Sequence, residues 1–273
     1  MSLTNLAALK RYINLKTVNS DLVLAGLIDS QSQAFLDETG RTTFDSQEQT
    51  EIRDGMGSDI MQLSFWPVTG FTSLQIDRRS IPLSTQPFQS GYVWNALGKV
   101  SLRCFEFCGG RQNVVAVYTA GYLPVDVFDE LQTIPAAPAS PDSWPQAYTI
   151  WVLRPNWQAN VQVKFFSGGA ILTPVNGLPA SGEYYVLGDG GYLFAAADAG
   201  KQVLMSYSAA GYPADLVGAV NEMVLLRYRQ KDQLEVASMS IAGTVTTYNN
   251  ADYPKDVWRV IKKYKRYFSV PGF

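Results

Sequence analysis

Residues 90–126 read SGYVWNALGKVSLRCFEFCGGRQNVVAVYTAGYLPVD, and residues 181–215 read SGEYYVLGDGGYLFAAADAGKQVLMSYSAAGYPAD. Both stretches contain a β-rich strand, a turn bounded by glycine, a second strand, and a Gly-Tyr pair followed by proline and an acidic residue. Tyr118 and Gly121-Tyr122 recur as Tyr207 and Gly211-Tyr212, with one more residue between tyrosine and glycine in the second copy. The repeat predicts two related β units in one chain.

Only the second copy runs directly into a convincing helix, which we predict from Pro213 to about Lys231. Proline suits the first helical position, and the apolar residues that follow are spaced for one buried face: Leu216, Val220, Met223 and Leu226. The first copy therefore resembles a unit whose continuation was displaced by an inserted second unit. On this interpretation, residues 133–212 could be removed without unfolding the helical part.

Helices are predicted at both ends of the chain. Thr4 or Asn5 can cap a short first helix, and Ser20 and Gly40 are start and stop signals for a longer one. A last helix is predicted from Pro254, with an apolar stripe of Val257, Val260, Ile261, Tyr264 and Phe268. These patterns predict an α+β fold, in which a helical body formed by both chain ends carries two β-rich units.

The expected domains follow from this order. Residues 1–55 and 213–273 form the two parts of the helical body, 56–125 the first β unit, and 126–212 the inserted second β unit. The second unit begins with a proline-rich stretch, 133–145, which predicts a stiff extended connector.

The composition restricts the chemistry. The 273 residues include no histidine, which excludes Ser-His-Asp and Cys-His catalysis and histidine metal sites. Cys104 and Cys108 are too few for a zinc site of cysteine and histidine ligands, and on one face of a strand they lie too far apart for a disulfide. We expect reduced thiols in a packed strand, no cofactor, no metal and no enzymatic activity.

The C-terminal end is the leading candidate for a partner-binding site. From Pro254 onward there are six basic residues against one acid, Asp256, on a chain of net charge −2, and the final residues YFSVPGF are apolar. The candidate residues are Arg259, Lys262, Lys263, Tyr264, Arg266, Tyr267, Phe268, Val270 and Phe273. A solvated helix face with a frayed terminus explains the same pattern, and contact with DNA stays open.

Three further motifs have two interpretations each. Gly188-Asp189-Gly190-Gly191 is a hairpin turn or a phosphate-binding loop, and the hairpin is favoured because no helix follows. Asp126, Asp129 and Glu130 are a cation or carboxylate site, or the exposed start of the connector. The abundant tyrosine and tryptophan residues line a sugar-binding face or fill β cores.

Membrane insertion and export are not expected. No apolar run approaches the ~20 residues that a membrane-spanning helix needs. The N-terminus, MSLTNLAALKRY, has no basic stretch followed by an apolar core, so it does not read as a secretory signal.

Several segments, in order along the chain, resemble the head–tail connector (adaptor, or head-completion) proteins of long-tailed bacteriophages. Residues 21–41, DLVLAGLIDSQSQAFLDETGR, are similar to the family's opening helix, and 213–229, PADLVGAVNEMVLLRYR, to its second long helix. The other matching segments are IRDG at 52–55, LSFWPV at 63–68, SLQID at 73–77, YTAGY at 118–122 and VASMSIAGTVTTY at 236–248. The departure from the family is the extra β unit, roughly residues 123–212.

The resemblance implies a structural role in the virion. Such proteins form a ring, usually of twelve copies, beneath the portal at the capsid–tail junction. The ring extends the DNA channel and joins the portal to the next connector or tail protein. It also implies that the C-terminal segment reaches the portal. A second class of function stays open from the residues alone, a β-rich carbohydrate-binding or glycan-acting module of a phage tail.

Overall fold

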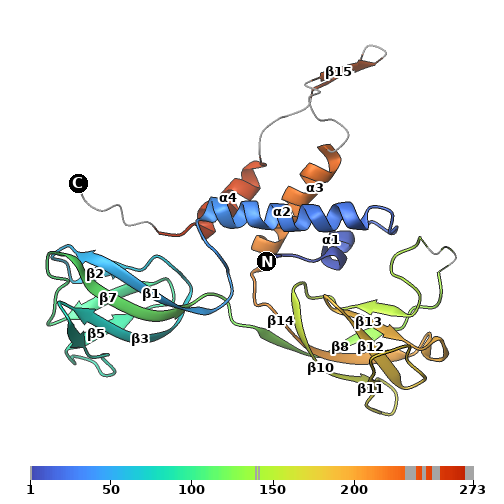
Figure 1. The fold of residues 1–273 in the computed structure, drawn as a ribbon, viewed down its shortest axis with the longest axis horizontal. Helices are drawn as coiled ribbons and strands as arrows, with labels where there is room; N and C mark the ends of the chain where they lie inside the picture. Colours follow the sequence, from blue (N-terminus) through green and yellow to red (C-terminus); the bar gives the residue numbers. More distant parts are fainter. Residues whose placement is uncertain are drawn as a thin grey trace. The chain divides into compact units, whose positions relative to one another are not determined.

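The structure, a computed structural model, describes residues 2–138, 140, 142–230, 238–241, 244–247 and 253–267. Its helices and mostly antiparallel sheets confirm the predicted α+β class (Figure 1). The chain divides into two compact units. The smaller unit comprises Thr39–Leu123 and Tyr264–Phe273, and the larger unit comprises Met1–Glu38 and Pro124–Lys263.

Two sheets form the smaller unit. The first has the strand order β1-β7-β3-β4, and the second has the order β2-β6-β5. Their bounds are β1 Gln47–Gly55, β2 Ile60–Gln62, β3 Val68–Ile76, β4 Arg79–Ile81, β5 Gly91–Trp94, β6 Lys99–Arg103 and β7 Gly110–Ala120. Apolar residues of both sheets, among them Leu74, Tyr92, Val100 and Tyr118, are buried in one core.

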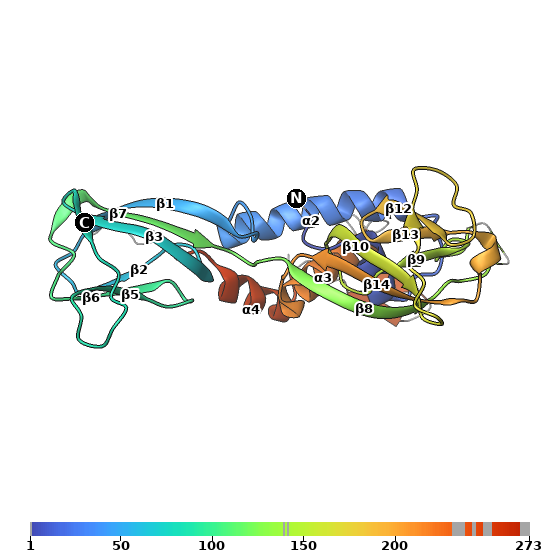
Figure 2. The ribbon, with the colours of Figure 1, turned by 90° about the horizontal axis from the view of Figure 1, so that it is seen from below.

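Two further sheets lie in the larger unit, with the orders β10-β14-β8 and β11-β12-β13-β9. β8, β10 and β14 run side by side in Figure 2. The bounds are β8 Val125–Thr133, β9 Thr149–Trp151, β10 Trp157–Phe165, β11 Thr173–Pro174, β12 Glu183–Gly188, β13 Gly191–Phe194 and β14 Gln202–Ala209. A 3-10 turn, η1, spans Ala196–Asp198. Their core includes Val163, Tyr184, Tyr192 and Tyr207.

The two sets of seven strands share one topology. In each set the seventh strand (β7, β14) lies between the first (β1, β8) and the third (β3, β10). In the second sheet of each set, the sixth strand (β6, β13) lies between the second (β2, β9) and the fifth (β5, β12). The exception is the fourth strand, because β4 pairs with β3 whereas β11 pairs with β12. The sequence repeat therefore covers only the last part of a longer shared arrangement.

The four described helices are α1 Leu6–Ile13, α2 Asp21–Thr39, α3 Ala214–Gln230 and α4 Lys255–Tyr264. Asn5 caps α1, since its side-chain oxygen accepts a hydrogen bond from the Ala8 amide at 2.8 Å. Gly40, at φ 69°, follows the end of α2, as its stop signal predicts. α3 contacts α1, and the Tyr228 hydroxyl in α3 lies 2.8 Å from the Ser20 hydroxyl before α2.

The unit boundaries differ from the predicted arrangement in two respects. Residues 47–55, expected in the helical part, form β1 and pair with β7. The second β unit lies in the same compact unit as α1, α2 and α3, whereas the sequence interpretation set it apart from the helices.

The proline-rich stretch lies against the link between α1 and α2. The Trp144 amide donates to the Lys16 carbonyl at 2.8 Å, and the Val18 amide donates to the Asp142 carbonyl at 2.9 Å. Thr17 and Ser143 form an antiparallel bridge between these bonds. This stretch is therefore attached to the helices by backbone hydrogen bonds, which its proline content alone does not predict.

One local prediction is wrong, and one is confirmed. Cys104 and Cys108 are free thiols but lie outside the packed strands, in the turn between β6 and β7. Two short antiparallel strands follow α3 in the chain, β15 Ser238–Ile241 and β16 Thr244–Thr247. The Gly188–Gly191 segment is the predicted hairpin turn, with Asp189 and Gly190 both at positive φ.

Candidate functional site

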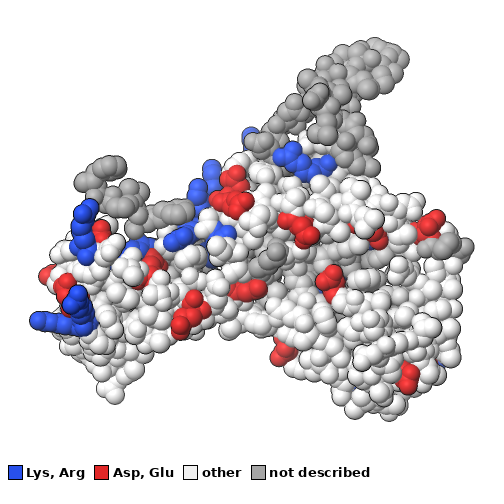
Figure 3. Space-filling view, viewed as in Figure 1, with Lys and Arg blue, Asp and Glu red and all other residues white. Residues whose placement is uncertain are grey.

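The predicted basic residues of α4 lie on its exposed surface. Arg259 pairs with Asp256 at 3.2 Å, and Lys263 pairs with Asp215 of α3 at 2.6 Å. Lys262 is also exposed. Such exposed pairs contribute little to stability. Lys and Arg side chains gather around α4 in Figure 3, so this helix presents a positive surface.

Tyr264 is a correction to the candidate site, because it is a core residue of the smaller unit. Its side chain is 1% exposed, stacks on Trp66 with ring centroids 5.6 Å apart, and meets the Phe44 ring edge-on at 6.0 Å. The α4 stripe that buries Val257 and Ile261 ends at this residue. The Tyr264 side chain is therefore packed inside the smaller unit.

Arg41 fixes this end of α4 from within the smaller unit. Its guanidinium donates to the Tyr264 carbonyl at 2.8 Å and to the Trp66 carbonyl at 2.6 Å, and it lies over the rings of Phe44 and Trp66. Burial lowers the pKa of Arg41 to about 10, so the side chain still carries its charge at neutral pH. We call Arg41, Phe44, Trp66 and Tyr264 the arginine clamp.

The residues after the clamp continue along the smaller unit. The Arg266 amide donates to the Thr39 carbonyl at 2.7 Å, and the Tyr267 amide donates to the Ser64 carbonyl at 3.2 Å. The Arg266 guanidinium lies over the Phe65 ring, and the Tyr267 side chain is 47% exposed. The remaining predicted residues, Phe268, Val270 and Phe273, lie outside the described part of the chain.

An exposed apolar face of the β10-β14-β8 sheet was missed by the sequence interpretation. Phe128 is 71% exposed, and Leu131 and Val161 are about half exposed. Asp126 and Asp129 are exposed in β8 too, and Asp129 pairs with Lys164 at 2.8 Å. The segment VDVFDELQT alternates only at Val125-Asp126-Val127, because the pattern is broken at the irregularity of the strand, so period two gave a weak signal.

Asp126, Asp129 and Glu130 therefore do not begin a connector. They belong to β8, which pairs with β14 on both sides of a register shift. A β-bulge near Asp129, at φ 55°, sends the Glu130 side chain back to the core side.

The smaller unit has an exposed apolar groove of its own. Ile52, Met56 and Ile60 line a hollow of about 500 Å³ beside β1 and β2, and each is between 45% and 64% exposed. β1 is an edge strand of its sheet. Exposed apolar clusters of this kind are typical of protein contact surfaces.

Each β unit contains the same pair of a buried tyrosine and a glutamate, of which Glu51 is buried and Glu130 half-buried. Tyr118 in β7 donates its hydroxyl hydrogen to Glu51 in β1 at 2.6 Å, and Tyr207 in β14 donates to Glu130 in β8 at 2.6 Å. Both glutamates pair with the residue two positions before the tyrosine, Ala116 or Met205. Each carboxylate also accepts a backbone amide, from Ser64 at 3.1 Å or from Leu153 at 3.0 Å.

These carboxylates serve as structural acceptors. Burial raises the pKa of Glu51, but hydrogen bonds from Tyr118 and Ser64 and the charge of Arg53 outweigh it, so its pKa lies below the ordinary value. Burial, together with the neighbouring carboxylate, raises the pKa of Tyr118 and of Tyr207. Both tyrosines therefore stay protonated and both act as donors at neutral pH.

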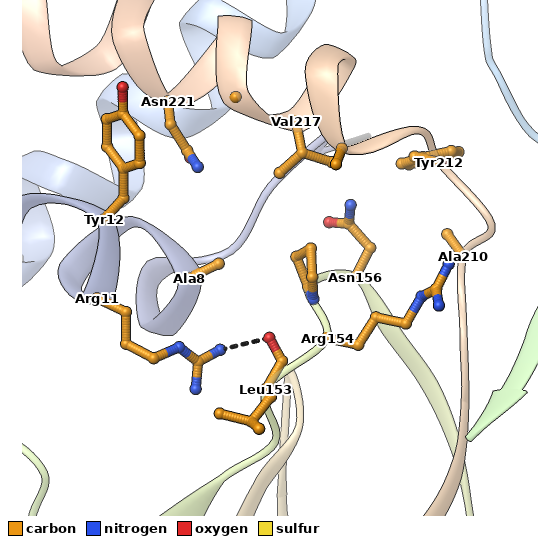
Figure 4. A pocket seen from close by; sticks show the side chains of 13 residues that line it. Ala8, Arg11, Tyr12, Leu153, Arg154, Asn156, Ala210, Tyr212, Val217 and Asn221 are labelled. Atoms are coloured by element: carbon orange, nitrogen blue, oxygen red, sulfur yellow. Dashed lines mark hydrogen bonds between the residues drawn. The ribbon is translucent and has the colours of Figure 1, made fainter. Parts of the chain in front are cut away.

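A cavity of about 600 Å³ lies in the larger unit between α1, α3 and the loop 153–156 (Figure 4). Arg11 on one side donates hydrogen bonds to the carbonyls of Trp151, Val152 and Leu153 and so holds that loop in place. Asn221 of α3 lines the opposite side. Burial lowers the pKa of Arg11, although the Glu130 charge opposes this shift.

The described residues form neither a metal-binding cluster nor a membrane-spanning helix. No group of three or more acidic or cysteine side chains in the described ranges is placed to hold a metal ion. Within the same ranges, no helix has the length and apolar character to span a membrane.

No protein-family model matches the chain, and no curated protein matches it. Among solved structures, it is similar to a chain described as "Neck of empty GTA particle computed with C6 symmetry". The two chains share 12% identity over 100% of this chain and 97% of that chain, with a TM-score of 0.31. At this identity and TM-score, the similarity establishes no function for this chain.

Proposed function

We propose that this chain is a structural protein of a phage virion, a head–tail connector that forms a ring beneath the portal. The ring, which we expect to contain twelve copies, extends the DNA channel and joins the capsid to the tail. Its partners are further copies of itself, the portal protein and the next connector or tail protein. We propose that it acts without cofactor and without enzymatic activity.

The observation that carries the proposal is the placement of the exposed apolar surfaces. One, around Ile52, Met56 and Ile60, belongs to the smaller unit, and the other, around Phe128, Leu131 and Val161, belongs to the larger unit. A closed ring needs two different surfaces on each subunit, because every contact is between unlike patches. Two separate apolar surfaces meet this requirement.

The segments that carry the family resemblance support the same proposal. Residues 21–41 correspond to α2 and the two residues after it, and 213–229 to α3 and the residue before it. The segments at 63–68 and 118–122 meet in the smaller unit, where Val68 pairs with Ala120. The matching sequence therefore falls on elements that build the fold.

The carbohydrate-binding alternative is less well supported. Five of the tyrosines that could stack on sugar rings are buried in the two cores: Tyr92, Tyr118, Tyr184, Tyr192 and Tyr207. Glu51 and Glu130 each accept a hydrogen bond from a tyrosine hydroxyl. Binding of the monomer to immobilised glycans would favour this alternative.

Assembly tests the proposal directly. We expect the full chain, alone or mixed with its portal protein, to form ring-shaped particles in negative-stain electron microscopy and to elute together with the portal. A chain that stays monomeric both alone and with the portal would contradict the proposed function.

The portal contact is proposed to involve the exposed basic residues of α4 and the tail after the clamp. We expect removal of 268–273 to leave the circular dichroism spectrum unchanged and to weaken co-elution with the portal at least tenfold. Arg111→Gln, at an exposed position in the smaller unit, is the control. Equal co-elution of the truncated and full chains would place the contact elsewhere.

Lys262→Gln tests whether α4 contacts DNA or only lies near it. A loss of DNA affinity in this variant that depends on the salt concentration would indicate contact.

A further inference from the structure

The apolar groove of the smaller unit lies beside two sheet edges. β1 is the outer strand of one sheet, and β2 is the outer strand of the other. The hollow of about 500 Å³ is lined by Ile52 and Met56, from β1 and the residue after it, and by Ile60 and Met61 of β2. An edge strand leaves one row of backbone N–H and C=O groups without a strand partner, so the groove suits an extended, apolar piece of chain.

Both charged side chains among the described residues of the groove are already engaged. Arg53 pairs with Glu51 and donates to the Ser64 hydroxyl at 2.5 Å. Asp54 accepts the Gln112 amide at 2.6 Å. We therefore expect an uncharged occupant, and the flexible methionine side chains of the groove can adjust to an aromatic ring.

The chain leaves the described part of the structure close to this groove. Tyr267 is the last described residue, and its amide donates to the Ser64 carbonyl at 3.2 Å. Arg53, which lines the groove, bonds to the hydroxyl of the same serine. Ser64 also lies only two residues after the end of β2. The segment that begins at residue 268 therefore starts beside the wall of the groove.

Residues 268–273 have the length and composition to fill the groove. They read FSVPGF, with three large apolar side chains and no charge. Six extended residues reach about 20 Å, whereas Ile60, at the start of β2, is at most about 14 Å from Ser64 along the chain. Val270 precedes a proline, which favours an extended backbone. A tether this short supplies an effective concentration of millimolar order, so a weak contact is enough to hold the segment.

We propose that residues 268–273 of the free chain lie in this groove and cover Ile52, Met56 and Ile60. The inference goes beyond the proposed function, because it concerns the chain before it meets a partner. One consequence rests on that function. When the portal takes the segment, the groove opens and exposes one of the two apolar surfaces that the ring uses, so the contact favours assembly on the portal over assembly in solution.

The methionine methyl groups of the full chain test the contact from the side of the groove. We expect deletion of 268–273 to shift the ¹³C-methyl signals of Met56 and Met61, and to leave those of Met205 and Met223, buried in the larger unit, in place. The peptide acetyl-Phe-Ser-Val-Pro-Gly-Phe-amide, added to the shortened chain, should return both signals saturably toward their original positions. A peptide with serine at the three apolar positions should not. The proposal is overturned if the deletion shifts neither signal, or if both peptides act equally.

Dilution distinguishes the segment of the same copy from that of another copy. We expect the difference between the full and shortened chains to stay constant over a tenfold range of protein concentration. A difference that disappears on dilution would show that another copy supplies the segment, and would overturn the proposal. These measurements need neither a ring nor a portal, so this inference and the proposed function fail separately.

The second test changes the groove and observes the segment. Ile52→Ser removes an exposed apolar part of the wall, so we expect the amides of Phe268 and Val270 to exchange hydrogen for deuterium at least threefold faster. Val93→Ser, at a half-exposed position of β5, is the matched control and should leave this exchange unchanged. Unchanged exchange in Ile52→Ser, or an equal rise in both variants, would overturn the proposal. Ile60→Ser repeats the test if the first variant does not fold.

Discussion

Tyr118 and Tyr207 show how single residues organise each β unit. Both are fully buried, and both direct a hydroxyl to a carboxylate on the neighbouring edge strand. The carboxylate in turn accepts a backbone amide from a segment outside that strand. One side chain on the central strand thus fixes the register of the edge strand and the position of a loop.

Removing either hydroxyl should destabilise the unit that contains it. We expect Tyr118→Phe and Tyr207→Phe each to lower the free energy of unfolding by about 1.5–3 kcal/mol, because each removes one charge-assisted hydrogen bond to a carboxylate. Urea denaturation followed by fluorescence measures the change.

The matched control is Tyr267→Phe, which alters a half-exposed hydroxyl. We expect its effect to stay within ~0.5 kcal/mol. Losses of the same size in the control and the two buried variants would show that the buried pairs have no special role.

Glu51 should give the smaller unit a characteristic response to acid. Its pKa lies below the ordinary value of 4.5 in the folded chain, so its contribution to stability is complete above about pH 4.5. The contribution is lost as the pH falls through the lower folded pKa. We expect Glu51→Gln to be less stable at neutral pH and to lose less further stability between about pH 4.5 and 2. The account would be contradicted if the free energy of unfolding of the variant and that of the parent chain fell by the same amount over this pH range.

The sequence repeat identifies Tyr118 and Tyr207 as equivalent residues, but it does not identify the glutamates to which they donate hydrogen bonds. Glu51 precedes Tyr118 by 67 positions, and Glu130 precedes Tyr207 by 77. Sequence spacing within one strand carries no information about such distant pairs.

At the scale of elements, the arginine clamp decides where the chain goes after α4. Within the smaller unit, it holds Tyr264 through hydrogen bonds to two carbonyl groups and contacts with two aromatic rings. The tail proposed to reach the portal therefore starts from a fixed point at Tyr267.

Breaking the clamp should release that starting point. In Arg41→Leu the carbonyls of Tyr264 and Trp66 lose their charged donor, at about 1.5–3 kcal/mol for each bond. We expect the Arg266 and Tyr267 amides to exchange hydrogen for deuterium at least tenfold faster. Arg103→Leu, which removes a guanidinium over the exposed Phe88, is the control in the same unit. Unchanged exchange in Arg41→Leu would show that other contacts hold the segment.

Element positions were predictable where local signals were strong. Asn5, Ser20, Gly40 and Pro213 mark helix ends close to those in the structure, and the Gly188–Gly191 turn is a hairpin. β8 was missed because its acidic residues suggested a solvated connector, although its pairing with β14 decides its conformation. The sequence interpretation placed Tyr264 among the partner-binding residues. The pattern of an amphipathic helix does not reveal which part of the chain a given side chain packs against.

At the scale of the whole molecule, the larger unit depends on contacts between its helices and its β strands. Arg11 holds the loop after β9, Asn5 donates to the Asp189 carbonyl at 3.1 Å, and Asn156 donates to the Leu3 carbonyl at 2.8 Å. The helices are therefore hydrogen-bonded to the second β unit at several points.

Deleting residues 133–212 should consequently disturb the helices, contrary to the expectation from the insertion pattern. The deletion removes the acceptors of Arg11 and also leaves β8 without β14. We expect a clear loss of helical circular dichroism signal and of cooperative melting in the remaining chain. Leu178→Ser, at an exposed loop position, should leave both unchanged. Retention of the full helical signal after the deletion would restore the original interpretation.

The division of the chain also sets an order of events on the ribosome. Residues 39–123, which hold all seven strands of the smaller unit, emerge soon after α1 and α2. The helix α3, which contacts α1, emerges only after a further ninety or so residues of second β unit. At ~5–20 residues per second, the early helices wait roughly 10–40 s for it. During nascent synthesis, the apolar side chains of α2 that are later buried are a natural target for chaperones.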